Sequence, residues 1–240
     1  MDWIEGSART LMVRYSARAA IVYGSRVSGE ALAESDLDVL IVSPEVHEFE
    51  ETRISARDSV LLVDAEIDLR LTSLQGAKWS HVMSPEWRHA FFTGRLFGDW
   101  GWLRADLPLA RQGADDFLGD LAIQFGAALD WEGTHEETVA DLVRILRRVL
   151  LLEGALRGGD AVAASARWSH LAGVLDVPIE IVNGVRRKES VALMGIHPDA
   201  LGSIIKAKMA AMEEVLREYL PNEGDHALTG LLAEGAKAGV

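Results

Sequence analysis

Two kinds of hydrophobic pattern divide the chain. In the first hundred residues, short apolar runs typical of buried strands alternate with segments of helical spacing. Residues 19–23 are a continuous apolar run that ends at a glycine, and residues 36–42 place two aspartates before a second such run. Residues 65–71 alternate between apolar and charged side chains, as in a strand with one buried face. A shorter strand is expected near 95–98, and helices are expected at 3–18, 47–59 and 84–93.

From about residue 114 the pattern changes to long amphipathic helices. The clearest covers residues 199–220, where apolar side chains recur every three or four positions. Further helices are expected at 114–130, 135–156 and 160–175. The expected fold class is therefore an α/β domain with a mixed sheet, followed by an all-α helical bundle. The domains are predicted at residues 1–105 and 114–222, with a flexible tail at 223–240.

Composition and charge narrow the classes of protein that fit. The chain has 240 residues, a formal net charge of −13 and no cysteine, which excludes disulfides, thiolate zinc sites and a cysteine nucleophile. The acidity argues against a nucleic-acid partner, since affinity for DNA or RNA comes largely from Lys and Arg at phosphates. There is no apolar run of membrane-spanning length and no signal-peptide pattern, so we expect a cytoplasmic protein. A homodimer is one assembly that the sequence allows.

The aspartates at the start of the second strand are the strongest chemical signal. Asp36 and Asp38 are two positions apart, so both side chains point to one face of the strand. Two carboxylates beside a buried strand repel each other unless a cation lies between them, and Mg²⁺ prefers carboxylate oxygens. Asp68, on the next strand, is placed to supply a third carboxylate. Three such carboxylates holding one or two magnesium ions are typical of displacement at phosphorus.

The glycine and serine at the end of the first strand point to the same chemistry. Gly24 allows the backbone to approach a phosphate closely, and Ser25 can hydrogen-bond one. Either feature alone is weak, because alternating acidic residues on a strand are often a solvated face. The combination of Gly-Ser, a short excursion, two spaced aspartates and a third aspartate on the next strand is much more specific.

The stretch YGSRVSGEALAESDLDVLIV resembles the signature of the DNA polymerase β-type nucleotidyltransferase superfamily, especially its minimal and antibiotic-modifying members. The resemblance implies that Gly24 and Ser25, together with Arg26 and Ser35, hold the nucleotide. It also implies that Asp36 and Asp38 bind Mg²⁺ and that Asp68, in EIDLRL, is either a third metal ligand or a general base. The three aspartates are the catalytic residues that this resemblance predicts, with an NTP, most simply ATP, as substrate.

The second half is similar to the helical domain of aminoglycoside nucleotidyltransferases in one segment, ILRRVLLLEGALRGGDAVAASA. The resemblance as a whole implies a magnesium-dependent enzyme that transfers a nucleoside monophosphate, such as AMP from ATP, to a hydroxyl of a small acceptor such as an aminoglycoside antibiotic. The alternative is a minimal nucleotidyltransferase that serves as a toxin–antitoxin partner protein and modifies or binds another protein.

An acidic segment bears on the choice of acceptor. Between Arg111 and Arg144 there are eight Asp and Glu residues and no Lys or Arg. This segment either attracts a cationic acceptor or reflects the preference of helix starts for carboxylates, at 114–120 and 134–141. Thr134 followed by Glu137 fits a capping box, which favours the second explanation for part of the segment. Three tryptophans either line an acceptor pocket or are buried in packing: Trp100, Trp102 and Trp131.

Overall fold

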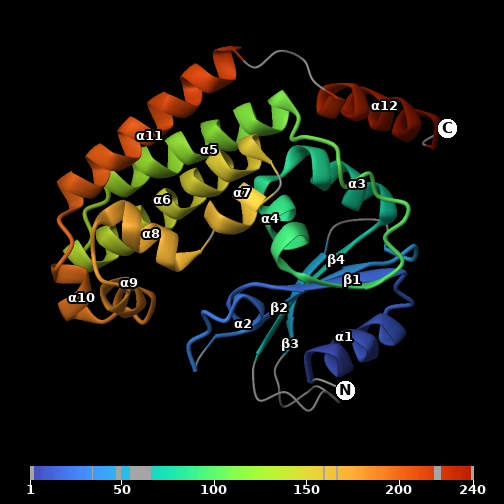
Figure 1. Ribbon diagram of the computed structural model, residues 1–240, viewed down its shortest axis with the longest axis horizontal. Helices are drawn as coiled ribbons and strands as arrows, with labels where there is room; N and C mark the ends of the chain where they lie inside the picture. The colour runs from blue at the N-terminus through green and yellow to red at the C-terminus, as the bar shows by residue number, and fades with distance from the viewer. Residues whose placement is uncertain are drawn as a thin grey trace. The chain divides into compact units, whose positions relative to one another are not determined.

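The computed structural model describes residues 3–33, 35–46, 50–54, 66–158, 160–165, 167–218 and 223–238. The chain divides into two compact units (Figure 1). The sheet unit comprises Met1–Val82, Glu86–Leu107 and Ala227–Val240. The helical unit comprises Met83–Pro85 and Pro108–His226. Among the described residues, no helix is both long and apolar enough to cross a membrane.

A mixed sheet forms the centre of the sheet unit. Its strands, within the described residues, lie in the order β3-β4-β2-β1-β5. The central pair β2 and β4 is parallel, and the other neighbouring strands are antiparallel. This mixed sheet confirms the α/β class expected for the first part of the chain. The strand bounds are Ala19–Tyr23 for β1, Leu37–Val42 for β2, Glu50–Ile54 for β3, Ile67–Thr72 for β4 and Arg95–Gly98 for β5.

Both faces of the sheet are covered by helices, which explains the continuous apolar runs of β1 and β2. Helix α1 (Trp3–Arg14) packs on one face, against alternate β2 residues such as Val39 and Ile41. Helices α3 (Leu74–Met83) and α4 (Pro85–Thr93) cover the other face, where they pack against Leu40 and Val42 of β2. Because side chains alternate along a strand, Asp38 points to the same face as Leu40. The carboxylate therefore lies on the α3/α4 side of the sheet.

A buried histidine and arginine join α3 to α4 beneath this face. His81 is fully buried and Arg88 nearly so. The Arg88 guanidinium donates to the backbone oxygens of His81 at 3.3 Å and Leu107 at 2.6 Å, and it lies over the Phe92 ring. Burial, reinforced by the positive charge of Arg88, lowers the pKa of His81 to about 4, with Asp106 opposing this shift. His81 is consequently neutral at pH 7 and serves as packing.

The low pKa of His81 predicts that stability falls in mild acid. Between about pH 6.5 and pH 4 the unfolded chain binds a proton at His81 that the folded chain does not. The free energy of unfolding should therefore decrease as pH drops through this window, by about 3 kcal/mol in total, and level off below it. Urea titrations of wild type and His81→Phe from pH 7 to pH 4 measure the difference. His170→Gln, at an exposed histidine, is the control. Equal pH slopes for wild type and His81→Phe would contradict the prediction.

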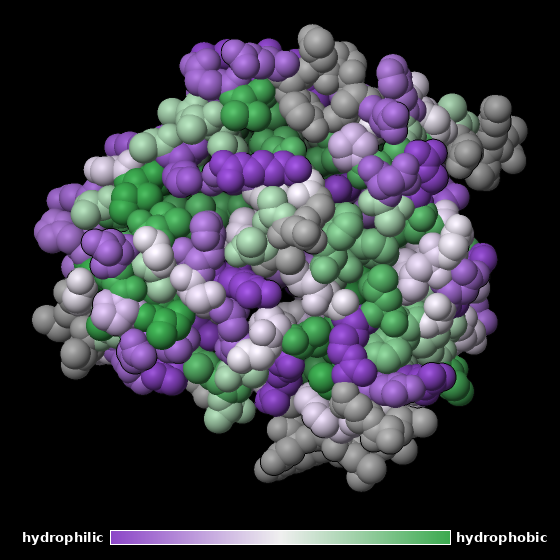
Figure 2. All heavy atoms as spheres, in the orientation of Figure 1, coloured by the Kyte–Doolittle hydropathy of each residue, from purple (hydrophilic) through white to green (hydrophobic). Residues whose placement is uncertain are grey.

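The helical unit is a bundle around one apolar core. Helices α5 and α6 pack side by side, and α11 lies against both (Figure 1). Leu121, Leu142 and Leu146 are among its fully buried side chains. Apolar side chains also reach the surface of this unit beside hydrophilic ones (Figure 2). The bounds are Arg111–Asp130 for α5, His135–Arg157 for α6, Asp160–Ser165 for α7, Trp168–Leu175 for α8, Ile179–Arg186 for α9, Ser190–Met194 for α10 and Pro198–Glu218 for α11.

The secondary structure differs from the sequence-based prediction in three places. Within the helix predicted at 47–59, Glu50–Ile54 form β3, because backbone hydrogen bonds to β4 stabilise an extended edge strand despite the charges. The remaining positions of that prediction lie outside the described residues. The helix predicted at 160–175 is divided into α7 and α8.

The third difference concerns the C-terminus. Residues 223–240 were expected to be a flexible tail, but Glu223–Ala238 form helix α12. Leu228 is buried, and the Leu231 carbonyl accepts a hydrogen bond from the Gln75 side chain at 3.3 Å. Glu223 and Asp225 lie in the first turn, where the helix dipole favours carboxylates. The burial of Leu228 and the carboxylates in the first turn stabilise helix α12, which the composition of this segment did not indicate.

Candidate active site

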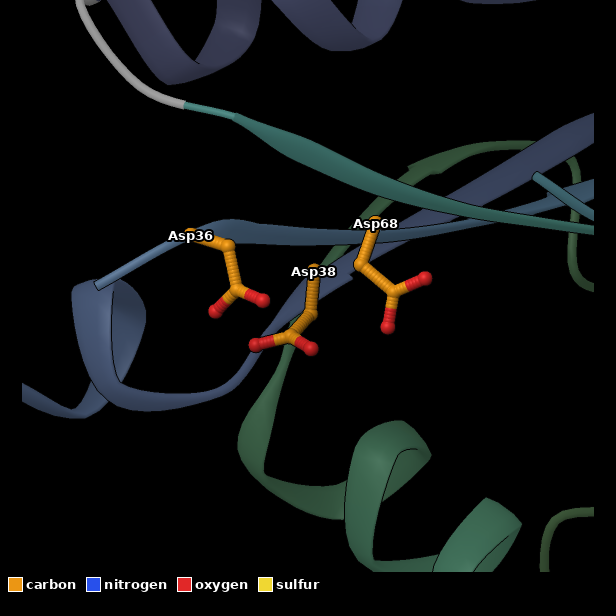
Figure 3. A group of neighbouring side chains, drawn as sticks. All are labelled: Asp36, Asp38 and Asp68. Carbon is orange, nitrogen blue, oxygen red and sulfur yellow. The ribbon is translucent and has the colours of Figure 1, made fainter. Parts of the chain in front are cut away.

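Three carboxylates meet on one face of the sheet. Asp38 in β2 lies directly opposite Asp68 in the parallel register with β4, and Asp36 immediately precedes β2 on the same side. The side chains converge (Figure 3), and one oxygen from each lies within 4.8 Å of the others. The period of two along β2 and the register of the parallel pair together produce this cluster. It is called the carboxylate trio below.

The electrostatics of the trio favour a bound cation. Asp68 has only 12% of its side chain exposed, and the guanidinium of Arg70 lies 3.8 Å from it. Three carboxylates with oxygens within 4.8 Å of one another repel each other at short range. Carboxylate oxygens at this spacing are suitable ligands for a hard divalent cation such as Mg²⁺. The donor set therefore fits the magnesium that the sequence predicts.

Gly24 packs against the trio. The register of β1 and β2 explains this contact. Tyr23, at the end of β1, lies opposite Asp38, so Gly24, the next residue, passes beside the Asp38 carboxylate. A Cβ atom at position 24 would lie 2.0 Å from Oδ2 of Asp38, far inside contact distance. Gly24 also has φ of +79°, a conformation that side chains disfavour. Glycine is required here on two counts, and the first was not evident from the sequence.

The chain turns immediately after Gly24. The short helix α2 (Ser25–Ser28) begins there, and the Gly24 carbonyl accepts hydrogen bonds from the amides of Val27 at 3.2 Å and Ser28 at 3.0 Å. Helix α2 ends at Gly29, which is left-handed with φ of +79°. Ser25 is thus held on the first turn after β1, one residue from the contact with Asp38. The backbone geometry of this turn is set locally, before any ligand binds.

A comparison with protein-family models identifies the domain that contains the carboxylate trio. Residues 9–84 match the model for the nucleotidyltransferase domain. The chain carries a nucleotidyltransferase domain. The matched segment contains Gly24, Ser25 and the whole carboxylate trio, and it confirms the resemblance to the DNA polymerase β-type superfamily. A search of curated proteins found no match.

Arg26 and Ser35, which are predicted to bind the nucleotide, form hydrogen bonds within the nucleotidyltransferase domain. The Arg26 guanidinium donates to the carbonyl oxygens of Ser35 at 2.7 Å and Ala33 at 3.4 Å. The Ser35 hydroxyl oxygen accepts from the amide of Leu32 at 2.9 Å. These bonds hold the excursion between α2 and β2 and so fix the approach to Asp36. Sequence reasoning missed this positioning function, and nucleotide contact by Arg26 and Ser35 stays a prediction.

The three tryptophans have different environments. In the nucleotidyltransferase domain's unit, Trp100 and Trp102 stack with ring centroids 5.5 Å apart and pack against the core beneath the sheet. Their indole nitrogens donate to nearby backbone carbonyls, which makes them packing residues. Trp131, in the helical unit, is 64% exposed and lines a cavity of about 400 Å³. Of the three, Trp131 is the most exposed.

Proposed function

We propose that the protein is a magnesium-dependent nucleotidyltransferase that transfers a nucleoside monophosphate, AMP from ATP, to a hydroxyl group of a small cationic acceptor of the aminoglycoside class. The observation that carries the proposal is the carboxylate trio beside Gly24 within a nucleotidyltransferase domain. In the reaction, an oxygen–phosphorus bond forms from the acceptor hydroxyl to the α-phosphorus. The bond from that phosphorus to pyrophosphate breaks, and the hydroxyl proton passes to a carboxylate.

The residues of the trio divide this work. Asp36 and Asp38 would hold the metal, with Asp68 as a further ligand. When bound, the cation acts as a Lewis acid that offsets the charge of the triphosphate. The turn at Gly24 and Ser25 would place backbone and hydroxyl donors beside the phosphates, one residue from the metal ligands. Asp68 is buried beside Arg70 and faces Asp38, which supports a metal-ligating role over that of a general base.

The acidic segment supports a cationic acceptor, although part of it has a structural explanation. Thr134 and Glu137 form both hydrogen bonds of a capping box at the start of α6. The same explanation does not hold for α5. That helix begins at Arg111, four residues before Asp115, so its carboxylates lie beyond the first turn. A negative potential over this part of the helical unit would concentrate cations near it.

The test is an incubation of the pure protein with Mg²⁺, each of the four labelled NTPs and a panel of aminoglycosides and lincosamides. Transfer of label to an acceptor, lost when EDTA is added, is expected with ATP. Activity on an uncharged hydroxyl compound equal to that on aminoglycosides would refute the cationic acceptor while preserving the transfer chemistry. An absence of transfer to every acceptor would refute the enzymatic function.

Asp68→Asn separates the two roles of Asp68 in the same assay. If Asp68 is a metal ligand, the Mg²⁺ concentration for half-maximal rate should rise by at least about 10-fold, because one of three anionic ligands is lost. If Asp68 is instead the general base, the Mg²⁺ midpoint should stay unchanged while the rate at saturating Mg²⁺ falls. Titration of Mg²⁺ against initial rate, for wild type and variant, measures both quantities. Glu45→Gln, an exposed carboxylate of the same unit, is the control.

A second candidate function is that of a partner protein in a toxin–antitoxin pair, which modifies or binds another protein. The observation that favours it is an exposed apolar and acidic surface on α5, whose side chains have the spacing of a helix-docking site.

A further inference from the structure

One side of helix α5 carries exposed residues in a regular helical row. Asp116, Asp120, Ile123 and Ala127 follow one another at intervals of four, three and four positions, which places them on one face of α5. Trp131, the residue after the last turn of the helix, follows four positions later. All five are exposed. Ile123 has 73% and Trp131 64% of its surface accessible, unusually high values for large apolar side chains. These five residues are called the α5 strip below.

A groove runs beside the α5 strip, between α5 and α6. Its cavity, of about 320 Å³, is lined by Gln124 and Ala127 of α5, by Trp131 after the end of that helix, and by Asp141 and Arg144 of α6. The cavity of about 400 Å³ adjoins it, sharing Trp131, Asp141 and Arg144. A bond to the Glu137 carboxylate fixes the Trp131 indole, so the ring is held in place at the junction of the two cavities. The surface is therefore concave where the two cavities meet.

The charge around the α5 strip determines what kind of surface can cover it. Eight carboxylates and no Lys or Arg lie between Arg111 and Arg144. Asp116 and Asp120 lie beyond the first turn of α5, where the helix dipole no longer accounts for them. Arg144, in the groove, is paired with Asp141 at 2.8 Å. Two further basic residues lie at this end: Lys188 lines the larger cavity, and Arg148 donates to Gln124 at 2.7 Å. The excess of carboxylates over basic side chains is therefore at the Asp116 and Asp120 end, where a partner surface with basic side chains would be complementary.

We infer that the α5 strip and its groove bind a basic amphipathic helix of a partner protein. Apolar side chains at positions i and i+4 of that helix would cover Ile123 and Ala127. Its Lys or Arg side chains would face Asp116 and Asp120 at one end and the indole of Trp131 at the other. The inference uses none of the residues of the carboxylate trio. It therefore stands or falls separately from the transfer reaction.

The test uses defined synthetic peptides with the full-length protein. The probe is a fluorescein-labelled peptide of about 18 leucines and lysines with leucine at i, i+3, i+4 and i+7, one helix face long enough to cover the strip. A peptide of the same composition in scrambled order and one with glutamate in place of lysine are the comparisons. Anisotropy titrations should show saturable binding of the first peptide, at least about 10-fold tighter than the scrambled one, and none of the acidic one.

Variants locate the binding. Ile123→Asp should weaken binding by at least about 10-fold, and Asp116→Lys with Asp120→Lys by a similar factor that shrinks at high salt. Val215→Asp, at an exposed valine of α11 in the same unit, is the matched control and should bind as wild type does. Ile123 is on the surface, so circular dichroism and thermal melting should be unchanged. Asp38→Asn, which removes a trio carboxylate, should retain full binding.

Four outcomes would overturn the inference. These are the absence of binding, equal binding of the ordered and scrambled peptides, and equal effects of Ile123→Asp and Val215→Asp. The fourth is assignment of the strip to another occupant. A concentration-dependent dimer abolished by Ile123→Asp, seen by analytical ultracentrifugation, would assign it to a second copy. Saturable binding of spermine that Ile123→Asp and Asp120→Lys weaken, without binding of the ordered peptide, would assign it to small cations.

Discussion

Asp38→Asn is expected to reduce nucleotidyl transfer by about 1,000-fold or more while the protein stays folded. Asp38 occupies the middle of the carboxylate trio, opposite Asp68 and beside Gly24. Asparagine keeps the size of the side chain but removes the charge that would hold a divalent cation. Initial rates of label transfer from ATP, at saturating Mg²⁺ and acceptor, measure the loss.

The control for this variant is Glu45→Gln, which removes one exposed carboxylate from the same unit. Thermal melting without Mg²⁺ should show Asp38→Asn at least as stable as wild type, because one of three mutually repelling charges is gone. Wild-type activity in Asp38→Asn would show that the trio is not the metal site. Unfolding of this variant would show that the charge has a structural function instead.

Gly24→Ala is the second variant with a large expected effect, for a steric reason. Its added methyl group would overlap Oδ2 of Asp38 at 2.0 Å, so the carboxylate or the turn must move. The backbone at this position, with φ of +79° and ψ of −163°, adds about 1–3 kcal/mol of strain for a residue with a side chain. We expect transfer to fall by about 100-fold or more, because displacement of a catalytic group by about 1 Å has that consequence.

Gly29→Ala is the matched control for this prediction. Gly29 has the same φ of +79°, but no atom lies within 4 Å of a Cβ built there. Gly29→Ala should lose less stability than Gly24→Ala in urea titrations, because ψ of 13° places Gly29 in the αL region and ψ of −163° places Gly24 outside it. Only Gly24→Ala should lose most of the activity. If the two lose activity equally, backbone strain rather than contact with Asp38 explains the effect, and the steric argument fails.

The sequence predicted the strands whose pattern is set by burial. β1, β2 and β4 have alternation or continuous apolar runs because helices cover both faces of the sheet. β3 has no such pattern: it is a short edge strand, and its pairing with β4 depends on backbone hydrogen bonds that side chains do not record. For the same reason the helix predicted over 47–59 was wrong where the structure describes it.

The candidate site was predictable in composition and only partly in geometry. The spacing of Asp36 and Asp38 indicates a shared face, but nothing in the sequence states that β2 and β4 are parallel with Asp38 opposite Asp68. The contact of Gly24 with Asp38 depends on the antiparallel register of β1 and β2, which is a long-range property. The hydrogen bonds of Arg26 to backbone carbonyls could not be predicted either, because they depend on the path that the chain takes between α2 and β2.

Those hydrogen bonds of Arg26 have a practical consequence for protein engineering. They join α2 to Ser35, the residue before Asp36, and the Ser35 hydroxyl accepts from the amide of Leu32. These bonds do not involve the side chain of Ala31. Residues between Gly29 and Leu32 contribute no ligand to the trio, and Ala31 is exposed. A short peptide tag or a cysteine for dye attachment, introduced at Ala31, would therefore report on the neighbourhood of the carboxylates without displacing them. Ala31 is thus a position for an optical probe of events at the carboxylate trio.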